Sequence, residues 1–520
     1  MEEQKNGLKK VLGFWDLMGI GVGQIIGSGI MVLTGICIAI TGAGTPFAFL
    51  LAAVLVICPN LVLAVLGSAV PATGGMYTYV RDYIGKKAGF FYLALLVAGQ
   101  LVLAMFAITF AEYACSIIPG LNNTVVAFAI LTLCYVMNIF GVDMAAKLQN
   151  VLVIVLVVAM GLFVAFGLPK VNWDVFVQPG AIMPSGLVGF LTGASLLTFA
   201  TGGAEFLSEL GGEMKNPGRD LPRAMISSTA IVAIIYAFIG VVAVGVLPIE
   251  DVAGQSLVLV ADAIFPKPLY YFFIIGGGMF AVASTLNATF TWCTKGLLIA
   301  AEEGWLPKKA ASISKFGTPW VLLTVFYIVG AIPILTGLDI ETISRLGNGL
   351  SLIYVMFPIF AGYLIYKKNP QAMANSTFKM KRVPLAILTT VALGSYMVKP
   401  FEEEEMLLRV AALLRRAKIL TERKLTVGST ELIYDSLTVI SNGTAQTLPK
   451  KEFLLLYKLL SFNNKTFTRR QLMDEIWDLD TESDENTVNV HINKLRDRFR
   501  DNHDFEIVTV RGLGYKAVKR

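Results

Sequence analysis

The chain has 520 residues, of which 55% are hydrophobic and 15% charged, and its mean hydropathy is +0.67. This composition excludes a soluble globular protein as a description of the whole chain and predicts a membrane protein. Charge is unevenly distributed, because residues 1–398 carry 22 Lys+Arg and 18 Asp+Glu while residues 399–520 carry 21 and 19. A charged domain therefore follows a long apolar region.

Ten apolar runs of membrane-spanning length follow one another in the first region. They lie at 11–39, 45–69, 88–116, 123–141, 147–168, 185–206, 222–247, 269–301, 319–337 and 343–366. An eleventh run, 383–398, has 16 residues and is short for a span. The first ten residues are charged and lead into the first run without a small-residue cleavage site, so we expect no removable signal peptide.

The loops between these runs differ in charge on the two sides of the membrane. Eighteen Lys and Arg residues lie at the N-terminus and in the loops that share its side, whereas the opposite loops hold only Lys170, Lys267 and Arg345. Because positively charged loops stay in the cytoplasm, the N-terminus and the loop after the tenth run are predicted to be cytoplasmic.

The first run is interrupted at Ile26-Gly27-Ser28-Gly29-Ile30. Two glycines one residue apart weaken a helix where lipid cannot satisfy loose backbone. A broken membrane helix presents a positive half-helix N-terminus and free carbonyls, which suit the carboxylate and ammonium of an amino acid. The alternative is that these small residues form a packing surface for a neighbouring helix.

The sixth run contains a second interruption, Phe199-Ala200-Thr201-Gly202-Gly203-Ala204-Glu205. Breaks at corresponding places in the first and sixth runs are the signature of an inverted five-plus-five repeat with its site at the repeat interface. The second break favours a binding site over a packing surface.

Residues 1–398 resemble the amino acid-polyamine-organocation permeases, which share the LeuT-like fold. The resemblance rests on four motifs: Gly27-Ser28-Gly29, Pro71-Ala72-Thr73-Gly74-Gly75-Met76-Tyr77, Tyr79-Val80-Arg81 and the stretch from Glu205 through residues 213–224. It implies an all-α membrane bundle with broken helices 1 and 6, and secondary active transport of amino acids by symport or exchange. It also implies a location in a bacterial-type cytoplasmic membrane, in contact with lipid.

The same resemblance assigns roles to the two interruptions. Gly27, Ser28 and Gly29, next to Ile26, would meet the substrate carboxylate. Phe199, Ala200 and Thr201 would offer carbonyls to the ammonium, and Phe199 would cover the substrate. Gly202 and Gly203 leave room beside the site for an apolar or bulky side chain.

Three ionisable residues lie at membrane depth, where an unpaired charge is costly and usually functional. They are Glu112, Glu205 and Lys295. We predict a gating or proton-linked role for Glu205, the alternative being a buried carboxyl bonded to backbone amides. Lys295 either replaces a sodium ion or reaches the cytoplasmic surface, and Glu112 is expected to extend to the interface. Three partners are possible for coupled transport: a proton, a sodium ion or an exchanged amino acid.

Other classes of chemistry have no support in the sequence. The five cysteines lie in apolar runs without paired spacing, so neither a disulfide framework nor a zinc site is expected. No nucleotide-binding loop is present, and we expect no metal, no cofactor and no enzymatic catalysis.

The seam between the two regions falls at residues 393–401 and ends with Tyr396-Met397-Val398-Lys399-Pro400-Phe401. This stretch resembles the end of a response-regulator receiver domain, but the acidic cluster and the phospho-acceptor aspartate are missing upstream. We interpret residues 399–420 as a receiver remnant and linker helix; the alternative is an ordinary charged linker helix.

Residues 421–520 resemble the OmpR/PhoB-type winged helix, a small α/β domain whose third helix enters the major groove of double-stranded DNA. The resemblance rests on the helix-opening stretches 448–453 and 468–472, on the basic segment 486–500 and on Thr509-Val510-Arg511-Gly512-Leu513-Gly514-Tyr515. It assigns DNA contacts to His491, Asn493, Lys494, Arg496, Thr509 and the wing residue Arg511.

The two resemblances conflict over topology. If 383–398 spans the membrane, the winged helix lies outside the cell; if it stays on the inner surface, the winged helix is cytoplasmic. We interpret the chain as a chimaera and predict an amino-acid transporter with a DNA-binding tail. The alternative is a membrane-tethered transcription regulator.

Overall fold

The computed structural model describes residues 8–27, 29–118, 120–178, 180–397, 424–434, 437–441, 444–461, 466–476, 486–500, 502–510 and 513–519. The chain divides into two compact units, Met1–Val410 and Ala411–Arg520. The predicted linker, 399–420, lies outside the described residues.

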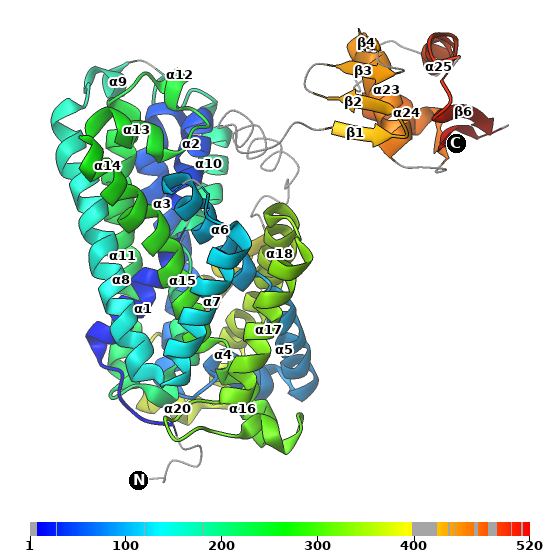
Figure 1. Cartoon of the computed structure of the whole chain (residues 1–520). Coiled ribbons are helices and arrows are strands. Elements are labelled where there is room, and N and C mark those ends of the chain that lie inside the picture. The colour runs from blue at the N-terminus through cyan, green and yellow to red at the C-terminus, as the bar shows by residue number, and fades with distance from the viewer. Residues whose placement is uncertain are drawn as a thin grey trace. The chain divides into compact units, whose positions relative to one another are not determined.

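Helices occupy all ten predicted apolar runs, and in Figure 1 the long helices of the first unit run roughly parallel to one another. The ten runs contain, in order, α1 (Phe14–Ile25) and α2 (Gly29–Thr41); α3 (Thr45–Ala69); α5 (Lys86–Gly99) and α6 (Val102–Ile117); α7 (Asn123–Ile139); α8 (Val142–Gly167); α10 (Gly186–Thr201) and η4 (Ala204–Glu209); α11 (Pro217–Gly245); α14 (Lys267–Phe273), η6 (Ile274–Met279), α15 (Phe280–Trp292) and α16 (Lys295–Glu302); α17 (Trp320–Thr336); and α18 (Ile340–Phe360). The eleventh run forms α21 (Arg382–Met397).

Short helices occupy the connections. They are η1 (Gly42–Gly44), α4 (Gly75–Tyr79), η2 (Val80–Ile84), η3 (Leu168–Lys170), α9 (Asp174–Val177), η5 (Gly211–Glu213), α12 (Ile249–Val252), α13 (Leu257–Ile264), η7 (Lys308–Ala311), η8 (Ala361–Tyr363), α19 (Ile365–Lys368) and α20 (Pro370–Asn375).

The first unit is a mostly helical membrane bundle. In the described part of the chain, seven helical stretches are long and apolar enough to cross a membrane, and two shorter apolar helices, Asn123–Ile139 and Trp320–Thr336, accompany them. Large apolar side chains remain exposed on the outer helices, such as Val151, Ile154 and Val158 on α8. Such an apolar face is stable in contact with lipid tails, whereas its exposure to water would be unfavourable.

The helix in the first run stops at Ile25 and resumes at Gly29, and the helix in the sixth run stops at Thr201 before Gly202 and Gly203. Gly203 has φ +129°, and a Cβ there would lie 2.9 Å from the carbonyl oxygen of Gln24, so a side chain is excluded. A Cβ on Gly29 would lie 3.3 Å from the Cβ of Ala200. The two interruptions therefore lie against each other.

The helices that carry the interruptions are surrounded by other helices. α1 packs against α8, α11 and α15, and α10 packs against α2 and α3. α15 is buried from Ala281 to Trp292, and its polar Asn287 donates to Gln149 Oε1 of α8 at 2.8 Å. Protein rather than lipid therefore surrounds the region where the two interruptions meet.

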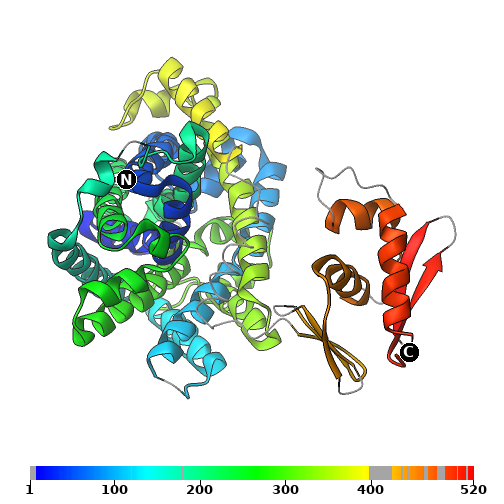
Figure 2. The ribbon, with the colours of Figure 1, turned by 90° about the horizontal axis from the view of Figure 1, so that it is seen from above.

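The second unit is a small α/β domain with its own apolar core. A four-stranded antiparallel sheet joins β1 (Lys424–Val427), β2 (Thr430–Ile433), β3 (Thr438–Ser441) and β4 (Thr444–Thr447) in that order. Three helices follow: α23 (Lys450–Ser461), α24 (Arg469–Ile476) and α25 (Asn486–Arg498). A second sheet has the order β5 (Phe467–Thr468), β7 (Gly514–Lys519), β6 (Phe505–Val510). Figure 2 shows α25 beside the β6–β7 hairpin.

Candidate functional site

A cavity of about 140 Å³ lies where the two interruptions meet. The structure brings six of the predicted substrate-binding residues and the predicted coupling residue Glu205 to its wall. The six are Gly27, Gly29, Phe199, Ala200, Gly202 and Gly203. The polar groups of two broken backbones thus converge on one small space, as a bound amino acid requires.

Two other described residues of the predicted site, Ile26 and Thr201, are not part of this wall. Ile26 is buried, and its carbonyl oxygen accepts a hydrogen bond from Thr285 Oγ1 at 3.3 Å. Thr201 is buried and donates its hydroxyl to the carbonyl oxygen of Leu197 at 3.0 Å. Ser28 lies outside the described residues, so its predicted contact with a carboxylate stays a prediction.

One face of α15 forms a part of the wall that the sequence analysis missed. Thr285, Thr289 and Trp292 line the cavity at helical spacing. Thr285 Oγ1 donates to the carbonyl oxygen of Gly23 at 3.0 Å, and Trp292 Nε1 donates to Gln24 Oε1 at 3.0 Å. The four- and three-residue spacing of these polar side chains in an apolar run is the signal that could have indicated them.

The aromatic residues of the site are Phe199 and Phe206, one on each side of the second interruption. Phe199 lines the cavity but keeps 48% of its surface exposed. Phe206 also lines it and stacks on Trp292, with ring centroids 4.1 Å apart and planes 5° from parallel. The predicted covering role of Phe199 stays a prediction, and the structure adds the Phe206–Trp292 stack as a second aromatic boundary.

Glu205 is the acidic side chain of the cavity wall in the described residues. It is buried, and its Oε2 accepts a hydrogen bond from the Gly203 N–H at 2.8 Å. This hydrogen bond is the contact expected from the alternative interpretation, in which Glu205 is a buried carboxyl bonded to a backbone amide. Glu205 nevertheless lines the cavity, so the bond to Gly203 does not remove the residue from the site.

Lys295 lies outside the cavity, in a buried cluster of charged residues. Its Nζ is 2.9 Å from Glu213 Oε1, and both side chains are at most 5% exposed. Nearby Glu209 is also buried and accepts a hydrogen bond from the Tyr92 hydroxyl at 3.0 Å. Lys295 thus pairs with a carboxylate instead of reaching the surface. Glu209 and Glu213 were not predicted as buried charges, because the sixth apolar run ends at residue 206. In the structure, the 3₁₀ helices η4 and η5 continue beyond that residue and bury both carboxylates.

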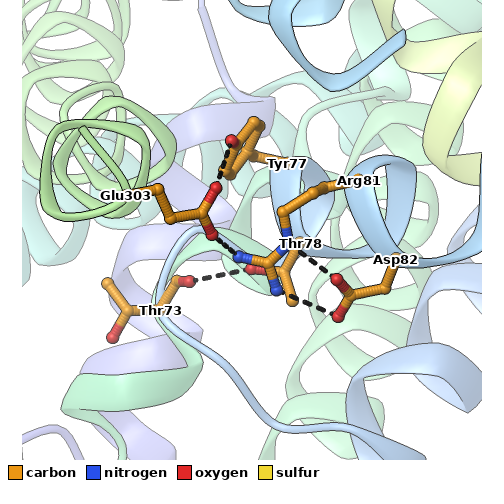
Figure 3. A network of polar contacts seen from close by, with 6 residues as sticks. All are labelled: Thr73, Tyr77, Thr78, Arg81, Asp82 and Glu303. Carbon is orange, nitrogen blue, oxygen red and sulfur yellow. Dashed lines mark hydrogen bonds and ion pairs between the residues drawn. The ribbon is translucent and has the colours of Figure 1, made fainter. Parts of the chain in front are cut away.

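A second polar cluster joins η2 to the residue that follows α16 (Figure 3). Arg81 forms an ion pair with Glu303 and another with Asp82, whose Oδ1 is 2.6 Å from its Nε. The Tyr77 hydroxyl donates to Glu303 Oε2 at 2.9 Å. These contacts connect the loop after α3 to the end of the eighth run, on the side where Lys and Arg accumulate.

In the second unit, the structure separates the predicted DNA contacts into two groups. Asn493 and Lys494 are exposed on α25. Arg496 instead donates to the carbonyl oxygen of Ile507 at 2.8 and 3.0 Å and to Thr509 Oγ1 at 2.7 Å. His491 Nδ1 lies 3.7 Å from Glu452 Oε1 of α23. Arg511 lies outside the described residues.

These contacts give Arg496 a structural role, and its predicted phosphate contact stays a prediction. It connects α25 to strand β6 and lies over the ring of Tyr515, 5.7 Å from its centroid. The sequence analysis also missed Val490, which is 53% exposed and lies three and four residues before Asn493 and Lys494 on the same face of α25.

A family model described as amino acid permease matches residues 12–407. This chain belongs to the amino acid permease family. The serine/threonine exchanger SteT of Bacillus subtilis is 28% identical to it over 386 residues, which cover 71% of the chain and 86% of SteT. The branched-chain amino acid permease BcaP of the same organism is 27% identical over 410 residues, which cover 73% of the chain and 85% of BcaP.

The permease also carries an OmpR/PhoB-type C-terminal domain. A family model described as the C-terminal part of transcriptional regulatory proteins matches residues 443–517. The heme response regulator HssR of Staphylococcus aureus is 43% identical over 123 residues, which cover 24% of this chain and 55% of HssR. The second unit therefore corresponds to one part of a response regulator.

Gly27→Leu tests the cavity. A Cβ at Gly27 would lie 3.2 Å from Thr285 Oγ1, and the remaining atoms of a leucine would occupy the cavity. We expect amino-acid uptake to fall by about tenfold or more, because a misplaced substrate loses most of its rate. Gly161→Leu in α8 is the matched control, since a Cβ there meets no atom within 4 Å. Normal uptake by Gly27→Leu at equal membrane abundance would contradict the site.

Lys295→Met tests the buried pair. Removing the ammonium leaves Glu213 buried without its partner, which costs about 3–5 kcal/mol of unfolding free energy. The unfolding temperature of the purified permease should fall, and the double variant Glu213→Leu/Lys295→Met should recover most of the loss.

The exposed pair Lys267–Asp262 provides the control for this measurement. Its side chains are 73% and 53% exposed, so Lys267→Met should leave the unfolding temperature close to that of the wild type. Equal unfolding temperatures for Lys295→Met and Lys267→Met would show that the buried pair contributes no more to stability than the exposed pair.

Proposed function

We propose that this permease is a secondary active transporter of amino acids in the cytoplasmic membrane. The observation that carries the proposal is the cavity at which the two interrupted helices meet, with Gly27 and Gly29 on one side and Ala200 and Gly203 on the other. Interruptions in the first and sixth runs fit a LeuT-like five-plus-five inverted repeat. In that arrangement the amides near Gly27 to Gly29 bind the carboxylate, and the carbonyls of Phe199 and Ala200 bind the ammonium.

The proposed substrates are small neutral amino acids. Among the described residues that line the cavity there is one carboxylate, Glu205, and no lysine or arginine. A second negative charge on an acidic substrate would be repelled by Glu205 and would find no cation. The cavity of about 140 Å³ lies below the roughly 300–1,000 Å³ of sites for drug-sized ligands. The names of SteT and BcaP, a serine/threonine exchanger and a branched-chain permease, agree with this class.

Counterflow into proteoliposomes tests the transport function. Vesicles that contain the purified permease and unlabelled serine or leucine should accumulate the same labelled amino acid from outside, without an imposed ion gradient. Uptake should cease when excess unlabelled neutral amino acid is added outside, and glutamate should compete poorly. A panel of neutral amino acids that enters no faster than into protein-free vesicles would contradict transport.

A further experiment identifies whether transport is coupled to protons, to sodium or to amino-acid exchange. A proton gradient and a sodium gradient are imposed one at a time on vesicles that contain no internal substrate. Uptake that requires internal amino acid indicates exchange, and uptake driven by one gradient indicates symport with that ion.

DNA binding by the C-terminal unit is a second proposed activity. The supporting observation is the exposed face of α25, on which Val490, Asn493, Lys494 and Asp497 are spaced as neighbours on a helix. Lysine suits phosphate, asparagine suits adenine, and an apolar side chain suits the thymine methyl group. Regulation by the intact chain would also need residue 520 to lie in the cytoplasm, which a compartment-sensitive reporter fused there would measure.

A pair of variants on α25 distinguishes DNA contacts from structural contacts. Lys494→Ala should weaken DNA binding by the C-terminal unit and reduce the slope of log K against log salt by about 1, with unfolding unchanged. Arg496→Ala should lower the free energy of unfolding by about 1.5–3 kcal/mol, because it removes hydrogen bonds from a charged group. If Arg496→Ala unfolds like the wild type and loses only DNA affinity, the structural assignment of Arg496 is wrong.

A further inference from the structure

Three basic residues are exposed where the chain enters α11. Lys215, Arg219 and Arg223 follow one another at intervals of four, on the side predicted to be cytoplasmic. The two acidic residues of this stretch, Glu213 and Asp220, are buried. Arg219 Nε is 4.0 Å from Asp220 Oδ1, the limiting distance of an ion pair, and the arginine side chain stays 66% exposed. This end of α11 therefore presents positive charge without an exposed carboxylate in residues 213–223.

The face of α11 that carries the two arginines continues as an apolar stripe. Ile231, Ile234 and Phe238 are 45%, 53% and 47% exposed. They share the face of Arg219 and Arg223, because intervals of eight, three and four residues return to one side of a helix. Ile231 lies about 12 Å along the helix from Arg223, which is within one leaflet of a hydrocarbon core about 30 Å thick. A single lipid molecule can therefore contact both the arginines and the start of the stripe.

The segment that enters α1 adds basic and aromatic side chains at the same end of the bundle. Helices α1 and α11 pack against each other and lie side by side in Figure 1, and the N–H of Lys215 donates to the carbonyl oxygen of Leu12 at 2.9 Å. Lys9 and Lys10 are exposed, and Trp15 is 77% exposed. Tryptophan is typical of the boundary between hydrocarbon and lipid headgroups. The exposed lysines and arginines therefore lie near the depth of the headgroups.

We propose that this surface binds an anionic phospholipid of the cytoplasmic leaflet. The lipid phosphate lies at Arg219 and Arg223, and an acyl chain follows the stripe that begins at Ile231. Guanidinium groups match the geometry of phosphate oxygens, and each basic residue near a membrane surface favours an anionic lipid by about fivefold. A zwitterionic headgroup carries a cation that these side chains repel, and free phosphate has no chain to cover the apolar stripe. The surface therefore selects a negatively charged headgroup attached to an acyl chain.

Arg219→Gln/Arg223→Gln tests the proposal, with native mass spectrometry of the purified full chain as the measurement. Phosphatidylglycerol and phosphatidylcholine are added at equal concentrations, and the bound molecules of each are counted. The wild type should prefer phosphatidylglycerol by about tenfold or more, whereas the variant should show a preference of about twofold or less. Lys367→Gln/Lys368→Gln is the matched control, because it removes two exposed charges from α19 on the same predicted side. Its preference should equal that of the wild type.

Three results would overturn the proposal: an unchanged preference in Arg219→Gln/Arg223→Gln, an equal loss in the α19 control, or displacement of the bound lipid by excess inorganic phosphate. The last result would indicate a site for free phosphate.

Arg219→Lys/Arg223→Lys provides a second test if the glutamine variant does not fold. It keeps both charges and should keep most of the preference, which should weaken as salt is raised in the wild type and in this variant. A preference that does not depend on salt would contradict an electrostatic site. The measurement requires no transport, so its outcome is independent of the proposed transport function.

Discussion

A backbone amide or carbonyl cannot stay unpaired inside a membrane, and the structure of this permease depends on how it meets that constraint at two interrupted helices. At the first interruption, Thr285 of α15 donates its hydroxyl to the carbonyl oxygens of Gly23 and Ile26. At the second, the Glu205 carboxylate accepts the Gly203 N–H. Polar side chains thus pair with the broken backbone, one from α15 and one from the second interruption itself, and residues of both interruptions line a common cavity. The burial of α1 and α15 follows from this need, because lipid could supply no such partners.

The buried charges obey a related rule. Lys295 and Glu213 are both removed from solvent, and neither would be stable there without the other. Glu213 also belongs to the segment whose backbone accepts the N–H groups of Val11 and Leu12, just before α1. The pair therefore fixes the start of α16 to the segments that lead into the first interruption and out of the second. A conformational change at the second interruption has to carry this pair with it or break it.

The sequence predicted the interruptions because the first and the sixth runs both contain closely spaced glycines at corresponding places, which weaken a helix. It did not predict Thr285 or Phe206, since the side of a helix that faces a cavity is decided by the packing of distant segments. Arg496 shows the same limit in the second unit. The hydrogen bonds of Arg496 to Ile507 and Thr509 could not be predicted, because they depend on where strand β6 packs against α25. The helical bundle followed from hydropathy, whereas the α/β class of the tail followed from its resemblance to the OmpR/PhoB-type winged helix.

The most direct test of the account is an experimental structure of the permease saturated with a transported neutral amino acid. The account predicts one bound molecule between the interruptions, with its carboxylate at the amides near Gly27 and Gly29. Its ammonium should lie at the carbonyls of Phe199 and Ala200, within reach of the Glu205 carboxylate. An amino acid bound elsewhere, with this cavity closed or occupied by side chains, would contradict the central claim.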